Sequence, residues 1–302
     1  MLHVDLRAPQ GAELSFAASF AVGPGTICAL HGPSGAGKTT LLRAVAGLLP
    51  ANGSLLFAGL DYRSLPPWQR PIGWVPQRQG LVPHWTPEEH LRALGPALSI
   101  EPRLALERLD LWRLGGRPVR QLSFGERQRL ALGRALFGGR RLFLLDEPFS
   151  GLDAAARRSM GDLLLERVEA LGACALIATH DLHDVQRLCD QLCLIADGRM
   201  LAQGPTHDLV RRPPNPQAAI LLGYQILAGG LAVHPAQARW QADPDLVAVR
   251  AVVERARPKD FGWRIELRAQ DGGRFAADLG SEGPLPTAGE TVDVYFPDLR
   301  LT

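Results

Sequence analysis

Short apolar runs alternate with helical patterns along the first two thirds of the chain. The run TICALH (residues 26–31) has the length of a buried strand, a glycine-rich loop follows it, and TTLLRAVAGLL (residues 39–49) places apolar residues at helical spacing. Further runs of strand length occupy residues 72–77, 141–148, 173–180 and 191–197, and a helical pattern covers residues 154–171. This alternation predicts a mostly parallel sheet covered by helices, which is an α/β fold.

The pattern changes at residue 211. Three prolines in RRPPNPQ (residues 211–217) interrupt it. Beyond them, WRIELRA (residues 263–269) and TVDVYFP (residues 291–297) alternate apolar and polar positions, as strands with one exposed face do. The tripeptide DGG at Asp271–Gly273 has the composition of a hairpin turn between the first of these strands and RFAADL. We therefore predict a small all-β domain at this end of the chain.

These changes of pattern predict the domain organisation. The first domain covers residues 1–210, a linker covers residues 211–230, and the β domain covers residues 231–302. Within the first domain, a stretch rich in Leu, Arg and Ala lacks the alternation of strands. It predicts an inserted helical subdomain over about residues 86–135.

Composition narrows the class of protein. The chain has 302 residues, of which 46% are hydrophobic, so it is long and apolar enough for a folded core. The 33 basic and 31 acidic residues give a formal net charge of +2 and form no basic block of the kind that follows a nucleic-acid backbone. Nucleic acid is therefore not expected as a partner.

Cysteine usage and the apolar runs bear on location. The four cysteines have no disulfide-framework spacing, and the first residues lack a secretory pattern, so a cytosolic protein is expected. Cys189 and Cys193 lie near His180 and His183, but they lack the closed four-ligand spacing of a zinc site. The apolar run at residues 218–233 is shorter than the ~20 residues that span a bilayer. Any role at a membrane therefore requires a membrane-spanning partner.

The stretch GPSGAGKTT matches the phosphate-binding pattern G-x-x-x-x-G-K-[ST]. Glycines without a Cβ allow backbone N–H groups to approach phosphate oxygens, and the following helix directs its positive end to the same place. Lys38 is expected at the β- and γ-phosphates of a nucleotide, and the Thr39 hydroxyl at Mg²⁺. The predicted ATP-binding residues of this loop are Gly32, Pro33, Ser34, Gly35, Ala36, Gly37, Lys38, Thr39 and Thr40.

Two acids and a histidine end the later apolar runs. Asp146 and Glu147 follow the run LFLL, at the edge where parallel strands present ligand-binding groups. Asp146 is predicted to complete the magnesium site, and Glu147 to orient the attacking water or take its proton. His180 ends the next run and is expected to hydrogen-bond both Glu147 and the γ-phosphate. The alternative is that these are solvated residues at strand ends.

The stretch LSFGERQR (Leu122–Arg129) opens a second helix with Ser123 and Gly125 at its start, and this helix N-terminus is suited to an anion. Because one loop already binds the triphosphate, the second site is expected to hold the ATP of another copy in a two-fold, head-to-tail dimer. The alternative is an ordinary N-capped helix in which Ser123 is the cap and Glu126 the third helical residue.

With these motifs in order, residues 1–205 resemble the ATP-binding cassette (ABC) ATPases. The phosphate loop is followed by a Q-loop glutamine in VPQ, the signature LSFGERQRLALGRAL, the Walker B stretch LFLLDEP, the D-loop SGLD and the H-loop ATHD. The resemblance implies an ATPase with Mg²⁺ as cofactor, a RecA-like core with an antiparallel β segment, and a sandwich dimer. It implies that Gln77 couples the γ-phosphate and Mg²⁺ to a membrane subunit, that Ser123, Gly125 and Glu126 bind ATP, and that Asp153 communicates between the two sites.

The residues from 231 onward resemble, more weakly, the transport-associated OB-type domain of bacterial importers. The whole chain is similar to the molybdate-type import ATPases, so molybdate or a related oxyanion is the expected cargo; sulfate, ferric iron and polyamine are alternatives. Implied partners are a second copy, two transmembrane permease subunits and, indirectly, a periplasmic solute-binding protein. The implied location is peripheral, on the cytoplasmic face of the inner membrane.

The chain departs from the family pattern at two places. Phe124 stands where the signature usually has a glycine, so its ring is expected to point away from the nucleotide. The aromatic residue that usually stacks on adenine is absent from LRAPQG (residues 6–11), so no adenine contact is predicted. Two rival functions are a soluble ABC ATPase acting on DNA or ribosomes, which requires coiled coils or two cassettes, and a P-loop kinase, which has no use for a signature or an H-loop.

Overall fold

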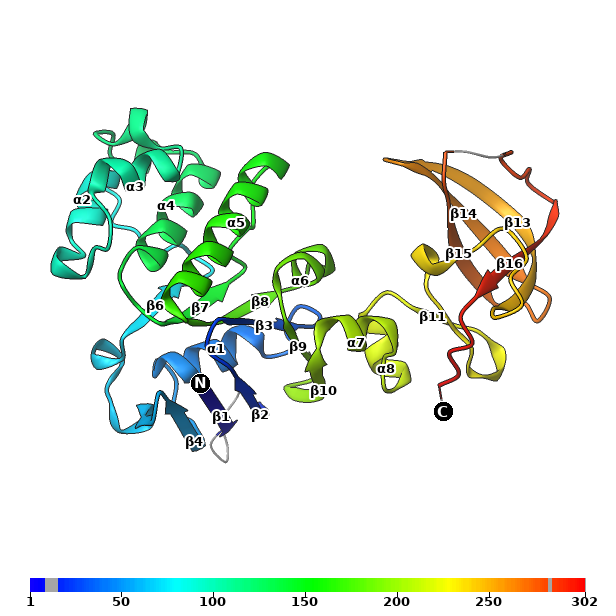
Figure 1. Ribbon diagram of the computed structural model, residues 1–302, viewed down its shortest axis with the longest axis horizontal. Helices are drawn as coiled ribbons and strands as arrows, with labels where there is room; N and C mark the ends of the chain where they lie inside the picture. Colours follow the sequence, from blue (N-terminus) through cyan, green and yellow to red (C-terminus); the bar gives the residue numbers. More distant parts are fainter. Residues whose placement is uncertain (9–15, 282–283, 302) are drawn as a thin grey trace. The chain divides into compact units, whose positions relative to one another are not determined.

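The structure is a computed structural model that describes residues 1–8, 16–281 and 284–301. It divides the chain into two compact units, Met1–His207 and Asp208–Thr302. Figure 1 shows the helices and the large sheet of the first unit and the smaller sheet of the second. The residues 9–11 of the stretch without an adenine-stacking aromatic lie outside the described part.

A ten-stranded mixed sheet forms the centre of the first unit, in the order β5-β4-β1-β2-β10-β9-β3-β8-β7-β6. The strands β9, β3, β8, β7 and β6 pair in parallel, as the apolar runs predict. Their neighbours β1, β2, β4 and β5 pair in antiparallel fashion, and so do β10 and β9. The strands are β1 Leu2–Arg7, β2 Ala17–Val22, β3 Thr26–His31, β4 Asn52–Phe57, β5 Leu60–Asp61, β6 Ile72–Val75, β7 Leu142–Asp146, β8 Cys174–Thr179, β9 Gln191–Ala196 and β10 Arg199–Pro205.

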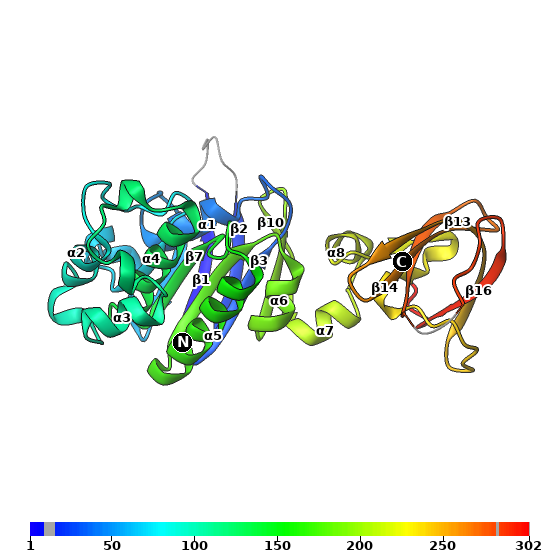
Figure 2. The same ribbon diagram turned by 90° about the horizontal axis from the view of Figure 1, so that it is seen from above.

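Helices cover both faces of the parallel strands. Figures 1 and 2 show α1 on one face and α4, α5 and α6 on the other. Two short helices, α2 and α3, belong to the stretch predicted as a helical subdomain, and they precede α4 in the chain. The helices of this unit are α1 Lys38–Ala46, α2 Pro87–Arg92, α3 Pro102–Arg108, α4 Phe124–Leu136, α5 Ala154–Leu171 and α6 Leu182–Leu188, and α7 Thr206–Arg211 spans the boundary between the units.

The core beneath the phosphate loop is continuous with the sheet. Leu41, Leu42 and Val45 of α1 are almost fully buried among apolar side chains of the parallel strands, including Leu30 and Leu176. Burial of each such side chain contributes roughly 1.5–3 kcal/mol. The first turn of α1 is thereby fixed at the carboxyl edge of the sheet, where ligands bind in folds of this type.

Strands dominate the second unit, which also holds the last four residues of α7, helix α8 (Pro216–Leu221) and short turns, so the predicted small β domain is confirmed. Strands β11 Gln225–Ile226 and β12 Ala232–Val233 form a pair, and a four-stranded antiparallel sheet has the order β15-β14-β13-β16. Its strands are β13 Val247–Lys259, β14 Gly262–Ala269, β15 Arg274–Leu279 and β16 Thr291–Phe296. The predicted hairpin joins β14 to β15, where the Gly272 N–H donates to the Ala269 carbonyl. Among the described residues, no helix is long and apolar enough to cross a membrane.

The segment predicted as a linker, residues 211–230, has regular structure. It contains helix α8 Pro216–Leu221 and strand β11. The Asn215 side chain accepts a hydrogen bond from the Ala218 N–H, and Pro216 occupies the first helical position. Proline is tolerated there because the first N–H groups of a helix have no intrahelical partner. The prolines therefore mark a helix start in this segment.

Candidate nucleotide-binding site

The phosphate loop connects β3 to α1 and is shaped by its glycines. Gly35 and Gly37 have φ values of +81° and +99°, a backbone region that side chains with a Cβ rarely occupy. Gly37 is the N-cap of α1 and offers no side-chain hydrogen bond to the helix. The first N–H groups of α1 therefore remain available to a ligand, and the helix dipole favours an anion there.

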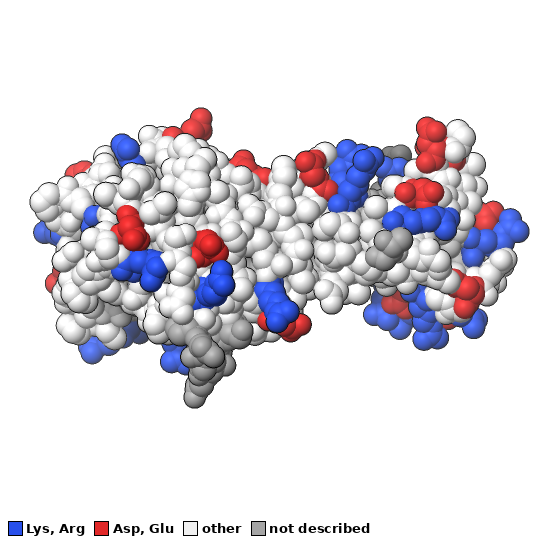
Figure 3. Space-filling view, turned by 90° about the horizontal axis from the view of Figure 1, so that it is seen from below, with Lys and Arg blue, Asp and Glu red and all other residues white. Residues whose placement is uncertain are grey.

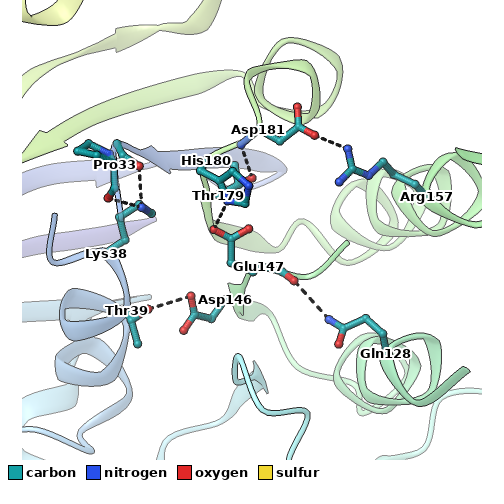
Figure 4. Close-up of polar contacts among 11 residues, drawn as sticks. Pro33, Lys38, Thr39, Gln128, Asp146, Glu147, Arg157, Thr179, His180 and Asp181 are labelled. Atoms are coloured by element: carbon teal, nitrogen blue, oxygen red, sulfur yellow. Dashed lines mark hydrogen bonds and ion pairs between the residues drawn. The ribbon is translucent and has the colours of Figure 1, made fainter. Parts of the chain in front are cut away.

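Lys38 lies over this loop. Its ammonium group donates hydrogen bonds to the carbonyl oxygens of Gly32 and Pro33, at 2.7 and 2.9 Å (Figure 4). Burial lowers the pKa of Lys38, while the carboxylates of Glu147 and Asp146 act in the opposite direction. A buried cation held by two carbonyl dipoles is suited to exchange them for phosphate oxygens, which carry full negative charge.

Thr39 and Asp146 form the expected metal-binding pair. The Thr39 hydroxyl donates to Asp146 Oδ1 at 3.1 Å, although 107 positions separate the two residues. The other oxygen, Asp146 Oδ2, is buried and has no hydrogen-bond partner among the described residues. Burial raises the pKa of Asp146, against the effect of the Thr39 hydrogen bond. A hydroxyl beside an unsatisfied carboxylate oxygen fits Mg²⁺, which prefers oxygen ligands.

Glu147 and His180 come together at the ends of β7 and β8. His180 Nδ1 lies 2.8 Å from Glu147 Oε1, and Figure 4 shows the two side chains directed toward each other. Glu147 has a φ of +49°, and its N–H donates to the Ala178 carbonyl at 2.9 Å. The parallel pairing of β7 with β8 places these residues at one edge. The contact predicted between this acid and this histidine is confirmed.

The predicted nucleotide ligands beyond the phosphate loop lie outside this cluster of polar contacts. Gln77 is exposed in the turn after β6, and no hydrogen bond joins it to Thr39 or Asp146 in the described part of the chain. Ser123 and Glu126 form a reciprocal capping box at the start of α4, with hydrogen bonds of 3.3 and 2.7 Å. Gly125 lies in the first turn of the same helix. Asp153 caps α5 by accepting from the Ala156 N–H at 2.8 Å. Roles for these residues toward ATP stay predictions.

Phe124, the unusual residue of the signature, packs against the D-loop of its own chain. A Cβ on Gly151, whose φ is +70°, would lie 2.4 Å from Phe124 Cδ1, so the ring rests on the glycine backbone. Phe124 is 45% exposed.

We expect Phe124→Gly to keep ATP hydrolysis within about threefold of wild type, because substitution of an exposed contact of this kind changes stability by about 0.5 kcal/mol. Steady-state ATPase assays measure this. A loss of more than about tenfold, equivalent to ~1.4 kcal/mol in the barrier, would show that the ring acts in hydrolysis.

Two buried glutamines were not predicted. Gln128 of α4 is 2% exposed and contacts the backbone after β7, and Gln79 is 8% exposed and contacts Gln128. The signal for Gln128 is its place on the helix: Ala131, Leu132 and Ala135, at intervals of three, four and seven residues, are all buried. A polar residue on a buried helix face needs partners, and the partners come from distant segments.

A buried acid lies beside the H-loop. Asp184 of α6 is 3% exposed, and Arg157 of α5 lies 3.7 Å from its Oδ1 and also pairs with Asp181. Burial raises the pKa of Asp184, while Arg157 opposes this and Asp181 adds to it. At a pH between the ordinary aspartate pKa and this raised pKa, Asp184 is therefore protonated in the folded state and ionised in the unfolded chain. This linkage makes the Asp184 contribution to stability fall as the pH rises from the ordinary aspartate range toward the raised pKa.

Asparagine does not titrate, so we expect Asp184→Asn to abolish this fall in stability with rising pH. The free energy of unfolding of the variant, relative to wild type, should therefore increase from about pH 4, which is the ordinary aspartate pKa, to about pH 7. Urea unfolding at the two pH values measures the difference. Asp162→Asn, at a side chain 64% exposed, is the control. A relative stability that falls with pH would mean that attraction to Arg157 outweighs burial.

The geometry defines the class of protein. A strand, a glycine loop and a helix hold Lys38 and Thr39 opposite Asp146, Glu147 and His180, which is the arrangement of a P-loop nucleotide-binding ATPase. A family model described as ABC transporter matches residues 16–150.

Relatives extend the match. The thiamine import ATP-binding protein of Cereibacter sphaeroides is 40% identical over an alignment of 222 positions, and the match covers 71% of this chain and 96% of that protein. The sulfate/thiosulfate import ATP-binding protein of Nocardia farcinica is 34% identical over an alignment of 293 positions, and the match covers 89% of this chain and 88% of that protein. A solved ATP-binding subunit of an ABC transporter is 28% identical with a TM-score of 0.62, covering 70% of this chain and 92% of that one. The chain belongs to the ATP-binding subunits of ABC transporters of the import type, and it is an ATPase.

Proposed function

We propose that this chain hydrolyses ATP to energise a bacterial importer of molybdate or a related oxyanion such as sulfate. The observation that supports ATP hydrolysis is the contact between Glu147 and His180, which lies beside the contact between Thr39 and Asp146. The oxyanion cargo is supported by the extent of one match. The alignment with the sulfate/thiosulfate protein covers 89% of this chain and so includes much of the second unit.

Each residue at the carboxyl edge has a proposed role in hydrolysis. Lys38 exchanges its two loop carbonyls for β- and γ-phosphate oxygens. Thr39 and Asp146 hold Mg²⁺, which neutralises charge on the phosphates when it is bound. Glu147 orients a water for attack and accepts its proton, and His180 fixes the Glu147 carboxyl group through the 2.8 Å contact.

The signature completes the site from a second copy. Ser123, Gly125 and Glu126 lie at the start of α4, a helix of 13 residues whose N-terminal N–H groups favour an anion. In a two-fold, head-to-tail dimer each signature contacts the nucleotide of the other copy, and Asp153 lies between the sites. Gln77, exposed on the turn after β6, then couples the nucleotide to a transmembrane permease subunit.

The assembly follows from these roles. Two copies of the chain bind two permease subunits from the cytoplasmic face of the inner membrane, and a periplasmic solute-binding protein delivers the cargo. The second unit is proposed to be the transport-associated OB-type domain. On its surface basic side chains pair with acidic ones, as Arg250 does with Asp293 and Arg264 with Asp278, and Figure 3 shows both charges interspersed. This mixture supports a role without nucleic acid.

A thiamine importer is the second candidate, because the thiamine relative has 40% identity and is covered over 96% of its length. Its alignment covers 71% of this chain.

Uptake by cells that lack the gene tests the proposal. Cells complemented with wild type or with Glu147→Gln are supplied with molybdate, tungstate, sulfate, thiamine, ferric iron or spermidine. We expect wild type alone to restore uptake of an oxyanion. Restoration of thiamine, iron or spermidine instead would overturn the oxyanion assignment and keep the importer. If cells that lack the gene take up all of these solutes normally, the proposal that this chain energises import of any of them is wrong.

A further inference from the structure

We propose that Gln79 and Gln128 are positioning residues that hold the backbone at Glu147 and join it to the turn after β6. This inference rests on the proposed role of Glu147 in hydrolysis. It adds a direct polar connection within one chain, from the segment that carries Gln77 to the segment that carries the catalytic carboxylate. Three separate parts of the sequence form the connection: the turn after β6, the signature helix α4 and the end of β7.

Gln128 is the centre of the connection. Its side-chain amide donates to the Pro148 carbonyl at 2.9 Å and lies 3.4 Å from the Glu147 carbonyl, and Figure 4 shows it directed at this backbone. Its own oxygen accepts from Gln79 Nε2 at 3.1 Å. With 2% of its surface exposed, Gln128 has little access to water that could replace these partners.

Gln79 uses both ends of its side-chain amide. Nε2 donates to the Gln128 oxygen and to the Phe124 carbonyl at 3.3 Å, while Oε1 accepts from Arg127 Nε at 3.3 Å. The residue has a φ of +30°, which is uncommon for a residue other than glycine. Such a backbone persists where surrounding contacts hold it, and here the side-chain partners Phe124, Arg127 and Gln128 lie in the first five residues of the signature helix.

The backbone of Glu147, like that of Gln79, has a positive φ that surrounding contacts must hold in place. Its φ of +49° is also in the left-handed region, and the peptide after it carries the carbonyl that Gln128 approaches. The direction of the Glu147 side chain depends on this backbone, and so does its 2.8 Å contact with His180. Loss of the Gln128 amide would leave the Pro148 carbonyl without this donor and allow the turn to relax.

Gln79, at the end of the connection that is distant from Glu147, lies beside a surface pocket. Gln79 lines a 260 Å³ pocket together with Arg78, Arg120 and Arg127. A displacement of this turn would therefore change the Gln79–Gln128 contact and, through it, the backbone that sets the Glu147 carboxylate. The connection passes through α4, so the signature helix and the carboxylate are expected to shift together.

The test is a double-mutant cycle in ATP turnover. Gln128→Met and Gln79→Met keep the side-chain length and remove the amide, and Gln203→Met, at an exposed position on β10, is the matched control. Each variant is made in wild type and in the Glu147→Gln background, and kcat, KM for ATP, ATP-dependent dimerisation and Tm are measured. Two variants at opposite ends of the contact keep the test usable if one of them does not fold.

In the wild-type background we expect either substitution to lower kcat about 10- to 100-fold, the effect of displacing a catalytic group by up to about 1 Å. KM for ATP should stay within about twofold of wild type. In the Glu147→Gln background the same substitutions should change the residual rate less than about twofold, because the carboxylate they position is absent. An equal loss in both backgrounds, or a lowered Tm with unchanged kcat, would overturn the proposal and indicate a packing role. Full activity of Glu147→Gln itself would instead overturn the role of Glu147, and the positioning role with it.

Discussion

Glu147→Gln is expected to lower the rate of ATP hydrolysis about 10²- to 10⁴-fold, the usual contribution of a general base. The amide has the shape of the carboxylate and can still contact His180, which lies 2.8 Å from Glu147 Oε1. It cannot accept a proton from water. The groups proposed to bind ATP and Mg²⁺, Lys38, Thr39 and Asp146, are unchanged, so nucleotide affinity should stay within about threefold, ~0.7 kcal/mol.

Three measurements check this prediction: single-turnover hydrolysis, binding of a fluorescent ATP analogue, and gel filtration with ATP and Mg²⁺. An ATP-bound dimer should accumulate in the variant because the step that ends it is blocked. Glu166→Gln is the matched control, since Glu166 is an exposed acid on α5 that pairs with Arg108. A wild-type rate in Glu147→Gln would contradict the assignment, and weak ATP binding would indicate a change in the loop as well as in the chemistry.

Gly32→Ala is expected to lower ATP affinity about 100-fold, the cost typical of moving a binding group by about 1 Å. A Cβ at this position would lie 2.0 Å from the carbonyl oxygen of Ile195 in β9, whose backbone pairs with β10 in the sheet. The phosphate loop must therefore shift. The shift would also displace the Gly32 carbonyl, which accepts a 2.7 Å hydrogen bond from Lys38.

Titration with a fluorescent ATP analogue measures the affinity, and thermal unfolding measures the fold. Gly116→Ala is the control, because a Cβ there meets no atom within 4 Å. Overpacking typically costs about 1–3 kcal/mol, so a lowered Tm accompanies the loss of affinity. Wild-type affinity in Gly32→Ala would show that the loop adjusts without moving its phosphate-binding groups.

Helix and strand positions near the phosphate loop followed from the sequence, with errors at their ends. The run at residues 39–49 predicts a helix, and α1 covers Lys38–Ala46. The helix ends where Gly47 adopts a φ of +79°, a C-cap that the apolar run does not reveal. The chain pattern did not predict the positions of five strands of the first unit, which are β1, β2, β4, β5 and β10. The burial pattern of β4 shows two buried residues in six, so its apolar signal is weak.

Sequence patterns also determined which residues gather at the carboxyl edge of the sheet. A phosphate loop is continuous in the chain, and parallel strands end at one edge, so the motifs alone predict that Lys38, Thr39, Asp146, Glu147 and His180 lie together. Their contacts at 3.1 Å and 2.8 Å agree with this. The order of the motifs likewise indicated the family.

Only the tertiary structure decided which distant groups hold these residues in place. Gln79 meets Gln128 across 49 positions, and Phe124 rests on Gly151 because α4 and the D-loop are neighbours in space. The spacing of residues in the sequence does not indicate the partner of a buried amide or of an exposed ring. These hydrogen bonds and packing contacts depend on which distant segments become neighbours in the folded chain. The sequence by itself determined which residues gather at the edge of the sheet, and the packing of α4 decided which distant side chains contact the backbone at Glu147.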